Sequence, residues 1–238
     1  KYWKNINWKR KRDYSNMNKL DHVAFIMDGN GRWGKKNKKN RNFGHIKGVE
    51  TVKKIVKSSI RSKIPIISFY VFSSENWSRP KKERIFLFNL IEKYFLREIN
   101  DIVKQDIKIN ILGETKGFSK NLKKVLRKTE EITRKNKKII VNLAINYGSK
   151  KEILNASKKI RGSYNERKFQ KYLYTKNMPN PDILIRTGGY KRLSNFFLWQ
   201  LAYTELFFLK KLWPDFNSND LNKIIKKFRK IKRNYGNI

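Results

Sequence analysis

The chain has 238 residues, enough for one sizeable domain with a buried core. It contains no cysteine, which excludes disulfide bonds, thiolate metal sites and a cysteine nucleophile. Its 58 Lys and Arg residues against 19 Asp and Glu give a formal net charge of +39, so its partners are expected to be anionic.

This excess of positive charge fits nucleic acid, an anionic membrane surface or a diphosphate substrate. Because the basic residues are spread through every segment, a composition bias of the whole chain is an alternative explanation. No apolar run approaches the ~20 residues that a membrane-spanning helix needs, and we recognise no secretory signal.

Residues 1–20 form a basic, aromatic arm in which Trp3 and Trp8 stand among lysines and arginines. Tryptophan with basic side chains is typical of a segment at a membrane interface. A packed terminal helix is the alternative interpretation. We expect the folded domain to span residues 21–238.

The segment HVAFIMDGNGRWG, residues 22–34, combines a buried strand with an acidic, glycine-rich loop. The apolar run 23–27 predicts the strand, and Asp28 follows it. Glycines let the backbone approach phosphate oxygens, backbone N–H groups can donate to them, and a carboxylate can hold Mg²⁺. The loop therefore suits a metal-bound diphosphate, although a tight turn of an α/β protein has the same composition. Its residues are Gly29, Asn30, Gly31, Arg32, Trp33 and Gly34.

A helix is predicted to begin near residues 41–48 and to run to about Ser62, because apolar residues recur at helical spacing. Arg41 and His45 lie about one turn apart at its start, and a helix N-terminus attracts anions. Beside Arg41 and the glycine loop, His45 is expected to touch phosphate. The alternative is a histidine that only caps the helix.

The rest of the chain alternates strands and helices. Strands are predicted at 66–72, 107–113, 139–145, 182–186 and 206–208, and helices at 83–103, 120–136, 150–160, 166–173 and 221–228. This alternation predicts an α/β fold, a single domain with a mainly parallel central sheet flanked by helices. Ligands of such sheets gather at the carboxyl ends of the strands, where Asp28, Ser73 and Arg186 fall. The wide apolar surface of helix 83–103 indicates either deep burial or the wall of a hydrophobic cavity.

A second cationic cluster surrounds another glycine turn, where Arg186 and Arg192 flank a pair of glycines and Ser194 follows. The fork of an arginine matches diphosphate oxygens in pairs. Glu205 lies beyond as a separate acid. Two cationic glycine loops and two acids suggest two diphosphates and a divalent metal, although each group taken alone fits a surface ion pair.

Together these segments resemble the cis-prenyltransferases, the family of undecaprenyl diphosphate and dehydrodolichyl diphosphate synthases. The resemblance runs in family order from His22 to near the C-terminus, through HVAFIMDGNGRWG, RNFGHIKG, FSSENWSRP, INYG, DILIRTGG, RLSNFFLWQLAYTELFF and LWPDF. It implies a fold with a hydrophobic tunnel. It also implies addition of isopentenyl diphosphate, with cis geometry, to an allylic diphosphate that we expect to be farnesyl diphosphate. The product would be a medium- or long-chain polyprenyl diphosphate for a dolichol-type lipid carrier.

The resemblance also implies roles for the matching residues. Asp28 would be the catalytic acid that binds Mg²⁺, the expected cofactor, and Glu205 the second metal-linked acid. Ser73 and Asn76 match a loop implicated in proton removal; because an amide is a weak base, Asn76 would orient a water or the diphosphate. The expected contacts of the allylic diphosphate are Gly29, Asn30, Gly31, Arg32, Arg41 and His45, with Trp33 lining or closing the site. The residues expected to hold or organise isopentenyl diphosphate are Arg186, Arg192, Ser194, Trp77, Arg79 and Glu83, and the tunnel would be bordered by Phe72 and helix 85–103.

Three positions depart from the family pattern. Tyr190 stands where an acid is usual and Lys191 follows it, which puts the geometry of that loop in question. Asn234 stands where many members have an arginine that reaches across a dimer, and Arg233 is one position early. The stretch 161–165 is short for the family.

Three hypotheses follow. The first is a homodimeric, Mg²⁺-dependent cis-prenyltransferase, because one chain carries both substrate motifs and both acids. The second is the catalytic subunit of a heteromeric enzyme with an accessory partner, which the departure at Asn234 favours. The third, a nucleic-acid-binding protein, rests on charge alone, and we expect no specific nucleic acid. Because the product would be a lipid, we expect peripheral membrane contact, at the cytosolic face of the endoplasmic reticulum if the source is eukaryotic and otherwise in the cytoplasm.

Overall fold

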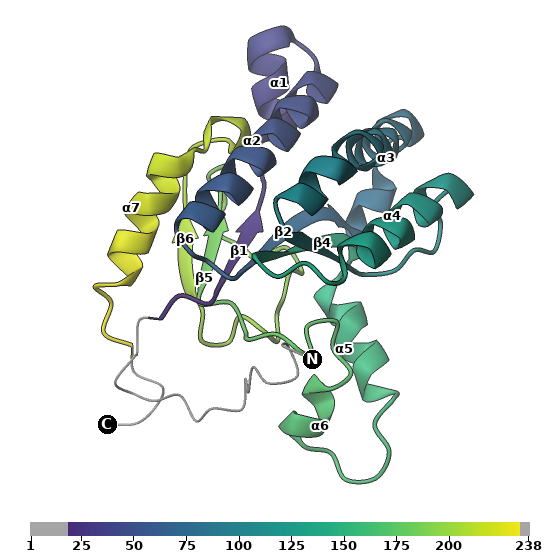
Figure 1. Cartoon of the computed structure of the whole chain (residues 1–238), viewed down its shortest axis with the longest axis vertical. Coiled ribbons are helices and arrows are strands. Elements are labelled where there is room, and N and C mark those ends of the chain that lie inside the picture. The colour runs from purple at the N-terminus through teal and green to yellow at the C-terminus, as the bar shows by residue number, and fades with distance from the viewer. Residues whose placement is uncertain (1–18, 234–238) are drawn as a thin grey trace.

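Six parallel strands form the centre of the computed structural model, in the order β3-β4-β2-β1-β5-β6 (Figure 1). The structure describes residues 19–233, so the predicted arm 1–20 lies almost wholly outside the described residues, as does Asn234. The strands are β1 His22–Ile26, β2 Ile66–Ser73, β3 Ile107–Leu112, β4 Ile139–Tyr147, β5 Ile183–Arg186 and β6 Glu205–Phe208. The helices are α1 Asn30–Lys38, α2 Arg41–Arg61, η3 Ser74–Ser78, α3 Lys81–Lys104, α4 Lys120–Thr133, α5 Ser149–Ser157, α6 Glu166–Gln170, η4 Trp213–Asp215 and α7 Ser218–Phe228.

The two faces of the sheet are covered by different elements. Because side chains alternate along a strand, Val23 and Phe25 point into one core and their neighbour Ala24 into the other. Helices α2, α3, α4 and α7 cover the first face (Figure 1). The second face is covered by the segment after β5, whose Phe196 and Phe197 are fully buried. The predicted α/β fold with a parallel sheet flanked by helices is therefore confirmed.

The main difference from the predicted elements is α1. The sequence predicted a flexible loop at residues 29–34, but the chain enters a helix at Asn30, directly after Gly29. Glycine has a low intrinsic helix propensity, but the packing of α1 on α2 overrides it. Gly44 of α2 permits this close approach, since a Cβ there would lie 1.8 Å from the carbonyl oxygen of Asn30.

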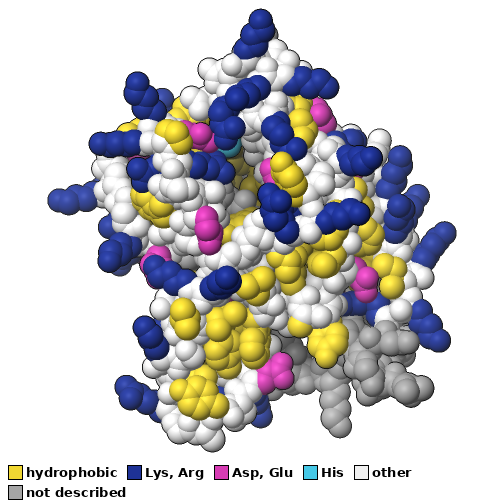
Figure 2. All heavy atoms as spheres, turned by 180° about the vertical axis from the view of Figure 1, so that it is seen from behind, with side chains coloured by type: hydrophobic (Ala, Val, Ile, Leu, Met, Phe, Trp, Pro, Cys, Tyr) yellow, Lys and Arg dark blue, Asp and Glu magenta, His cyan; other side chains and the backbone are white. Residues whose placement is uncertain are grey.

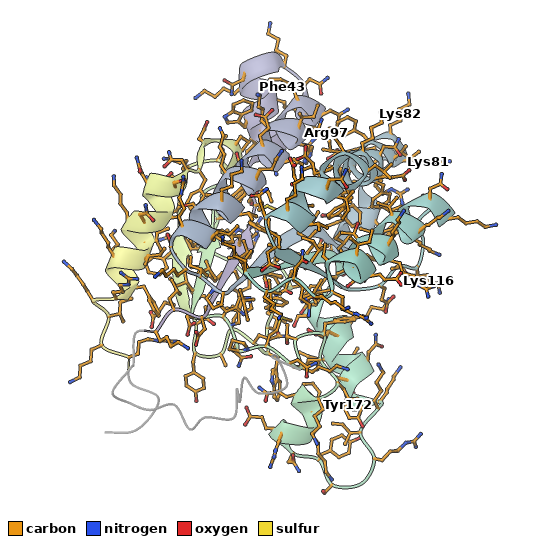
Figure 3. All side chains as sticks on the ribbon, in the orientation of Figure 1. Phe43, Lys81, Lys82, Arg97, Lys116 and Tyr172 are labelled. Carbon is orange, nitrogen blue, oxygen red and sulfur yellow. The ribbon has the colours of Figure 1, made fainter. Side chains whose placement is uncertain are left out.

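Smaller differences concern element ends. The loop 74–78 is a 3-10 helix, α3 begins at Lys81, α4 ends at Thr133, and α6 ends at Gln170. The side chains of Lys81 and Lys82 project outward from the start of α3 (Figure 3), which is typical of lysines in the exposed first turn of a helix. Within residues 19–233, no helix has both the length and the apolar character required to span a membrane.

Candidate active site

The carboxyl edge of the sheet brings Asp28, Ser73 and Arg186 to one end of the molecule, as the sequence predicted. Ser73 ends β2, Arg186 ends β5, and Asp28 follows β1. Ile26 is in register with Arg186 on one side and with Tyr70 on the other. Segments far apart in the chain therefore meet above the central strand.

Asp28 is the centre of a first cluster of ionic contacts. Its Oδ2 accepts a hydrogen bond from Nη2 of Arg186 at 2.9 Å, and its Oδ1 accepts one from Nη2 of Arg32 at 3.3 Å. Nη1 of Arg186 donates to Oγ of Ser194 at 2.8 Å and also to the carbonyl oxygen of Arg192. Arg186 is buried, and its Nε has no partner among the described residues. This arrangement holds one guanidinium rigidly at the site.

The glycine turn after β5 completes this first cluster. Nη2 of Arg32 donates to the carbonyl oxygen of Gly188 at 2.7 Å. Gly188 has a φ of 88°, and a Cβ there would lie 2.5 Å from the same Nη2 and 3.0 Å from Cβ of Asp28. Only glycine allows the backbone to adopt this conformation so close to the two side chains.

Glu83 lies at the centre of a second cluster, which contains two arginines and a histidine. Its Oε1 lies 3.1 Å from Nη2 of Arg41, 3.3 Å from Nη1 of Arg79 and 3.7 Å from Nε2 of His45. The guanidinium of Arg41 packs directly against Gly31. Burial lowers the pKa of Arg79, and the negative charge of Asp28 opposes this shift. Asp28 and Arg79 are therefore close enough to interact, so the two clusters are neighbours.

Burial and neighbouring charges set the protonation states of Glu83 and His45. Burial alone would raise the pKa of Glu83, but the hydrogen bond from Arg41 and the nearby positive charges lower it below its usual value. Burial, together with the charge of Arg79, lowers the pKa of His45 to about 4. At neutral pH Glu83 is therefore ionised and His45 is neutral, so His45 can donate only one hydrogen bond to a phosphate oxygen.

The N-terminus of α1 lies beside Asp28. No side chain caps this helix, so the N–H groups of its first turn have no intrahelical partner. Nδ2 of Asn30 donates to the carbonyl oxygen of Met27, while its buried Oδ1 has no partner among the described residues. Free N–H groups beside arginines are typical of an anion-binding site. At the start of α2 the side chain of Asn40 caps the helix by accepting from the backbone N–H of Asn42.

A largely apolar cavity of about 110 Å³ opens next to these clusters. Asn30 and His45 line its polar end, and Phe72 lines it from the sheet. Its remaining walls come from α2, α3, β2 and β4, together with Met27 and Trp213. As predicted, one face of α3 borders the cavity, through Leu87, Leu90, Ile91, Tyr94 and Phe95. The predicted ends of that wall are wrong, because Ile85 and Val103 are exposed.

The loop after β2 is fixed by its own side chains. Oδ1 of Asn76 accepts from the backbone N–H of Ser73, and the Ser73 side chain accepts from the backbone N–H of Asn76. Trp77 anchors the loop: its ring packs on Phe72 and Phe88, and its Nε1 donates to Oδ1 of Asn146 at 2.7 Å. Ser73 and Asn76 therefore hold the loop in shape beside the cavity.

Two expected site residues do not join these clusters. Trp33 donates through Nε1 to Oδ1 of Asp215 at 2.6 Å and stacks on Phe43, which lies against α1 (Figure 3). Glu205 is the first residue of β6, while Phe208 of that strand is level with Arg186. Three residues of strand place Glu205 roughly 10 Å from the edge where Asp28 lies. Its carboxylate lies 3.6 Å from Nε of Arg233 instead.

Sequence reasoning missed three contributors to the site. Oγ1 of Thr187 donates to the carbonyl oxygen of Asp28 at 2.8 Å. Nδ2 of Asn195 donates to Oε1 of Glu75 at 2.7 Å and so links the segment after β5 to the loop after β2. Tyr190 lies over the guanidinium groups of the site. Their place inside or next to the motifs was visible, but the direction of each side chain was not.

The donor groups present fit a magnesium ion held jointly with a substrate. Within residues 19–233 no three His, Asp or Glu side chains gather as a metal cage. Mg²⁺ is commonly bound by one or two carboxylates together with substrate phosphates and waters. Asp28 can supply that single carboxylate, because its oxygens have lone pairs beyond those used by Arg32 and Arg186.

The fold and the site combine a cluster of arginines and a free helix N-terminus at the carboxyl edge of a parallel sheet with an apolar cavity beside them. A family model described as putative undecaprenyl diphosphate synthase matches residues 26–236. The chain belongs to this family, the cis-prenyltransferases.

Relatives of known name span nearly the whole chain. An isoprenyl transferase of Prochlorococcus marinus is 40% identical over 98% of this chain and 91% of its own length. The ditrans,polycis-undecaprenyl-diphosphate synthase ((2E,6E)-farnesyl-diphosphate specific) of Haemophilus influenzae is 41% identical over 90% of this chain and 94% of its own length.

Solved structures share the fold. Lavandulyl diphosphate synthase from Lavandula x intermedia, in complex with dimethylallyl diphosphate, has a TM-score of 0.89 at 31% identity and covers 93% of this chain and 100% of its own. A probable undecaprenyl diphosphate synthase from Campylobacter jejuni has a TM-score of 0.79 at 31% identity and covers 92% of this chain and 99% of its own.

Proposed function

We propose that this cis-prenyltransferase elongates farnesyl diphosphate with isopentenyl diphosphate to give a polyprenyl diphosphate. The observation that carries the proposal is the continuity of the site: Asn30 and His45 belong both to the anion-binding end and to the wall of the apolar cavity. A ligand with a diphosphate head and an isoprenoid tail fits such a site. The relatives named for farnesyl diphosphate support this choice of primer.

In the proposed reaction, the allylic C–O bond of the primer breaks with carbocation character and diphosphate leaves. The homoallylic double bond of isopentenyl diphosphate attacks the allylic carbon, and a proton is then lost. Arg32, Arg41 and the first turn of α1 would hold the leaving diphosphate. Arg186, Arg192 and Ser194 would hold the diphosphate of the second substrate, because Arg186 and Ser194 already share a hydrogen bond. Donors placed before the reaction stabilise charge as it develops.

Asp28 would hold Mg²⁺ together with the leaving diphosphate. Bound there, the ion would neutralise the negative charge that develops on that group. For the proton that is lost, Ser73 and Asn76 remain the proposed positioning residues. Asn76 uses its carbonyl oxygen to fix the loop, so its amide N–H groups are the part that can orient a water or a diphosphate.

We infer that the enzyme is a homodimer. The edge strand β6 has no neighbour on its outer side among the described residues, and Leu206 of that strand is 44% exposed. Hydrophobic side chains gather in a band across the lower half of the face in Figure 2, with most Lys and Arg around the band. A large exposed apolar area on a strongly basic protein suits an interface. An interface at β6 would bury Glu205 against a second copy. An accessory subunit on the same edge remains the alternative.

The proposal also includes the length of the product and the place in the cell where the enzyme acts. We propose a medium-length polyprenyl diphosphate for a lipid carrier of undecaprenyl or short dolichol type; relatives named as undecaprenyl-diphosphate synthases support the first of these. Its long apolar chain has to reach a membrane, and a net charge of +39 favours contact with an anionic bilayer surface. We therefore propose that the enzyme contacts a membrane peripherally, at the endoplasmic reticulum if the source is eukaryotic.

The test is elongation by the purified full chain alone. It is incubated with farnesyl diphosphate, radiolabelled isopentenyl diphosphate and Mg²⁺, and the extracted lipid is sized by chromatography. We expect a ladder of products that differ by five carbons. Absence of any product longer than the primer would contradict the proposal, and elongation that appears only with an added subunit would favour the heteromeric alternative.

A further inference from the structure

An open groove of about 590 Å³ runs between α3 and α4, which pack side by side (Figure 1). Leu96, Ile99 and Val103 line it from α3, where spacings of three and four residues place them on one face of the helix. Val125 and Ile132 line it from α4. Leu96 is 62% exposed, and Val103 and Ile132 are also exposed. Apolar side chains of a strongly basic chain therefore face solvent along two neighbouring helices.

The charged side chains that line this α3–α4 groove are basic. They are Lys104 and Lys128, both exposed, and within residues 19–233 neither forms an ion pair with a carboxylate. The two acids in the second half of α3, Glu98 and Asp101, line a cavity on the side of α2 instead. The groove thus combines an apolar lining with uncompensated positive charge.

The groove lies toward the far end of α3 from the ionic clusters of the site. Glu83 of those clusters is in the first turn of α3, and the 16 residues from Glu83 to Ile99 correspond to about 24 Å of helix. Phe95 lines both the groove and the apolar cavity whose polar end meets the clusters. The groove therefore adjoins the cavity proposed for the isoprenoid tail and is distant from the groups proposed for the diphosphate head.

We propose that the α3–α4 groove is the surface by which the enzyme docks on an anionic lipid bilayer. Leu96, Val103 and Ile132 would enter the boundary of the acyl chains, and Lys104 and Lys128 would meet the lipid phosphates. The proposal rests on the proposed function, because it names the surface that makes the peripheral membrane contact. It orients the enzyme with its tail cavity toward the bilayer that receives the product and with its diphosphate site in water.

An anionic bilayer matches the groove because it offers anions at its surface and hydrocarbon beneath them. Apolar side chains of a helix that lies at an interface enter the boundary between headgroups and acyl chains, while basic residues beside them attract anionic lipids. Lysines can keep their methylene groups in that boundary and extend their charge to the headgroups. A nucleic acid would use the lysines but leave the apolar side chains in water.

The first test measures insertion directly. Because the chain has no cysteine, a single one can carry an environment-sensitive fluorophore such as NBD. Labelled Leu96→Cys and Ile132→Cys proteins are mixed with vesicles of phosphatidylcholine and phosphatidylglycerol. We expect their emission to move to shorter wavelength and to be quenched by lipids that carry a spin label on the acyl chain. Leu154→Cys, at a similarly exposed position of α5, is the matched control and should show neither effect.

The second test separates insertion from charge by sedimentation of the unlabelled full chain with the same vesicles. Leu96→Gln and Leu154→Gln leave the net charge unchanged. Leu96→Gln should weaken binding by about 10-fold, the loss expected when a leucine side chain is no longer buried in hydrocarbon, and Leu154→Gln should not weaken it. Lys128→Gln should weaken binding by about 5-fold at low salt, the usual contribution of one basic residue near an anionic surface. Its control is Lys82→Gln, at the opposite end of α3 (Figure 3).

Thermal unfolding of the variants should match that of the wild type, because the substituted side chains are exposed, and Ile132→Gln repeats the test from α4. The inference is overturned if Leu96→Gln and Ile132→Gln sediment with vesicles as the wild type does, or if labelled Leu96→Cys and Leu154→Cys respond alike. It is also overturned if Leu96→Gln changes the oligomeric state, since the groove would then be an interface between copies. Failure of the proposed function looks different: the wild type would dock with the predicted order of variants, yet would not elongate farnesyl diphosphate.

Discussion

Nη2 of Arg186 lies 2.9 Å from Oδ2 of Asp28, although 158 positions separate the two residues in the chain. The pair joins the loop after β1 to the end of β5 at the carboxyl edge of the sheet. Arg186 is buried and Asp28 is partly exposed, so the carboxylate is open to solvent while the guanidinium is enclosed by protein. A buried cation that loses its partner is costly, so the two residues stabilise the site together.

Asp28→Asn should lower turnover by about 100- to 1,000-fold, the loss typical when one group that stabilises transition-state charge is removed. The amide has the shape of the carboxylate and can still accept from Arg186, but it carries no charge for a cation. The measurement is incorporation of radiolabelled isopentenyl diphosphate at saturating Mg²⁺. Asp101→Asn, which changes an exposed carboxylate of α3, is the control and should keep full activity. Equal turnover of the two variants would reject the role of Asp28.

Gly188→Ala should destroy activity, while Gly162→Ala should not. Both glycines have positive φ, 88° and 71°, so each substitution brings a similar backbone strain of about 1–2 kcal/mol. A Cβ at residue 162 meets nothing within 4 Å, whereas one at 188 meets Arg32 and Asp28. Unfolding free energy and turnover are measured for both variants. An active Gly188→Ala enzyme would show that the close packing of Arg32 and Asp28 at this glycine is not needed.

The sequence predicted the edge of the sheet that carries the site, and the reason is physical. Parallel strands end at one edge, so Asp28, Ser73 and Arg186, each at or just after the end of an apolar run, had to lie close together. The same reasoning could not place Glu205 relative to Asp28. Glu205 is the first residue of β6 and so lies at the edge of the sheet opposite Asp28, but the apolar run 206–208 did not show that the strand begins there. It also could not predict α1, whose glycines favour a loop until the contact with α2 is known.

Side-chain direction was a second limit. Trp33 lies within the glycine-rich motif, but on a helix its ring turns toward Phe43 and Asp215. Tyr190 looked like an interruption of the arginine motif, and only its position among three guanidinium groups shows what it contacts. Sequence spacing orders residues along an element, whereas these contacts depend on rotamers and on neighbouring elements.

Unfolding free energy should decrease as the pH falls from about 6.5 to about 4, in part because of His22. Burial lowers the pKa of His22 to about 4, below the ordinary value of 6.5. Its Nδ1–H donates to the carbonyl oxygen of Pro179 and its Nε2 accepts from Oγ of Ser68, which itself accepts from Asn142. The neutral ring is therefore required in the fold. Between the two pKa values the unfolded chain binds one more proton, so stability is lost as the pH falls through this window.

This lowering of the pKa of His22 corresponds to a loss of about 3 kcal/mol in the free energy of unfolding as the pH falls from 6.5 to about 4. Urea unfolding of the wild type and of His22→Asn between pH 4 and 7 measures it. The variant should be less stable at pH 7 but should lose less stability on acidification, because one titrating group is gone. His45→Gln is the comparison, since the pKa of His45 is also lowered to about 4 and contributes separately. Identical pH slopes for the wild type and His22→Asn would contradict the prediction.

Leu206→Glu should convert the proposed dimer to a monomer. A charge on the outer side of the edge strand β6 would be buried against a second copy, and burying an unpaired carboxylate is costly. Light scattering at micromolar concentration should give about twice the chain mass for the wild type and the chain mass for the variant. Leu96→Glu, at a 62% exposed position on α3, is the control and should stay dimeric. A monomeric wild type would contradict the assembly directly.

Phe95→Ala should lengthen the products. Phe95, together with Tyr94, lines both the cavity next to the diphosphate loops and a second cavity of about 60 Å³ farther along α3. Its ring lies where the two spaces adjoin, so its removal should join them and admit at least one more five-carbon unit. Loss of a buried phenylalanine costs about 3–5 kcal/mol, so Phe95→Leu serves as a milder variant with a smaller effect in the same direction. Leu154→Ala, at an exposed position of α5 away from these cavities, should leave the product ladder unchanged. The lengths of the radiolabelled lipids are measured by chromatography. Unchanged lengths in stably folded Phe95→Ala and Phe95→Leu proteins would mean that the growing chain does not pass Phe95.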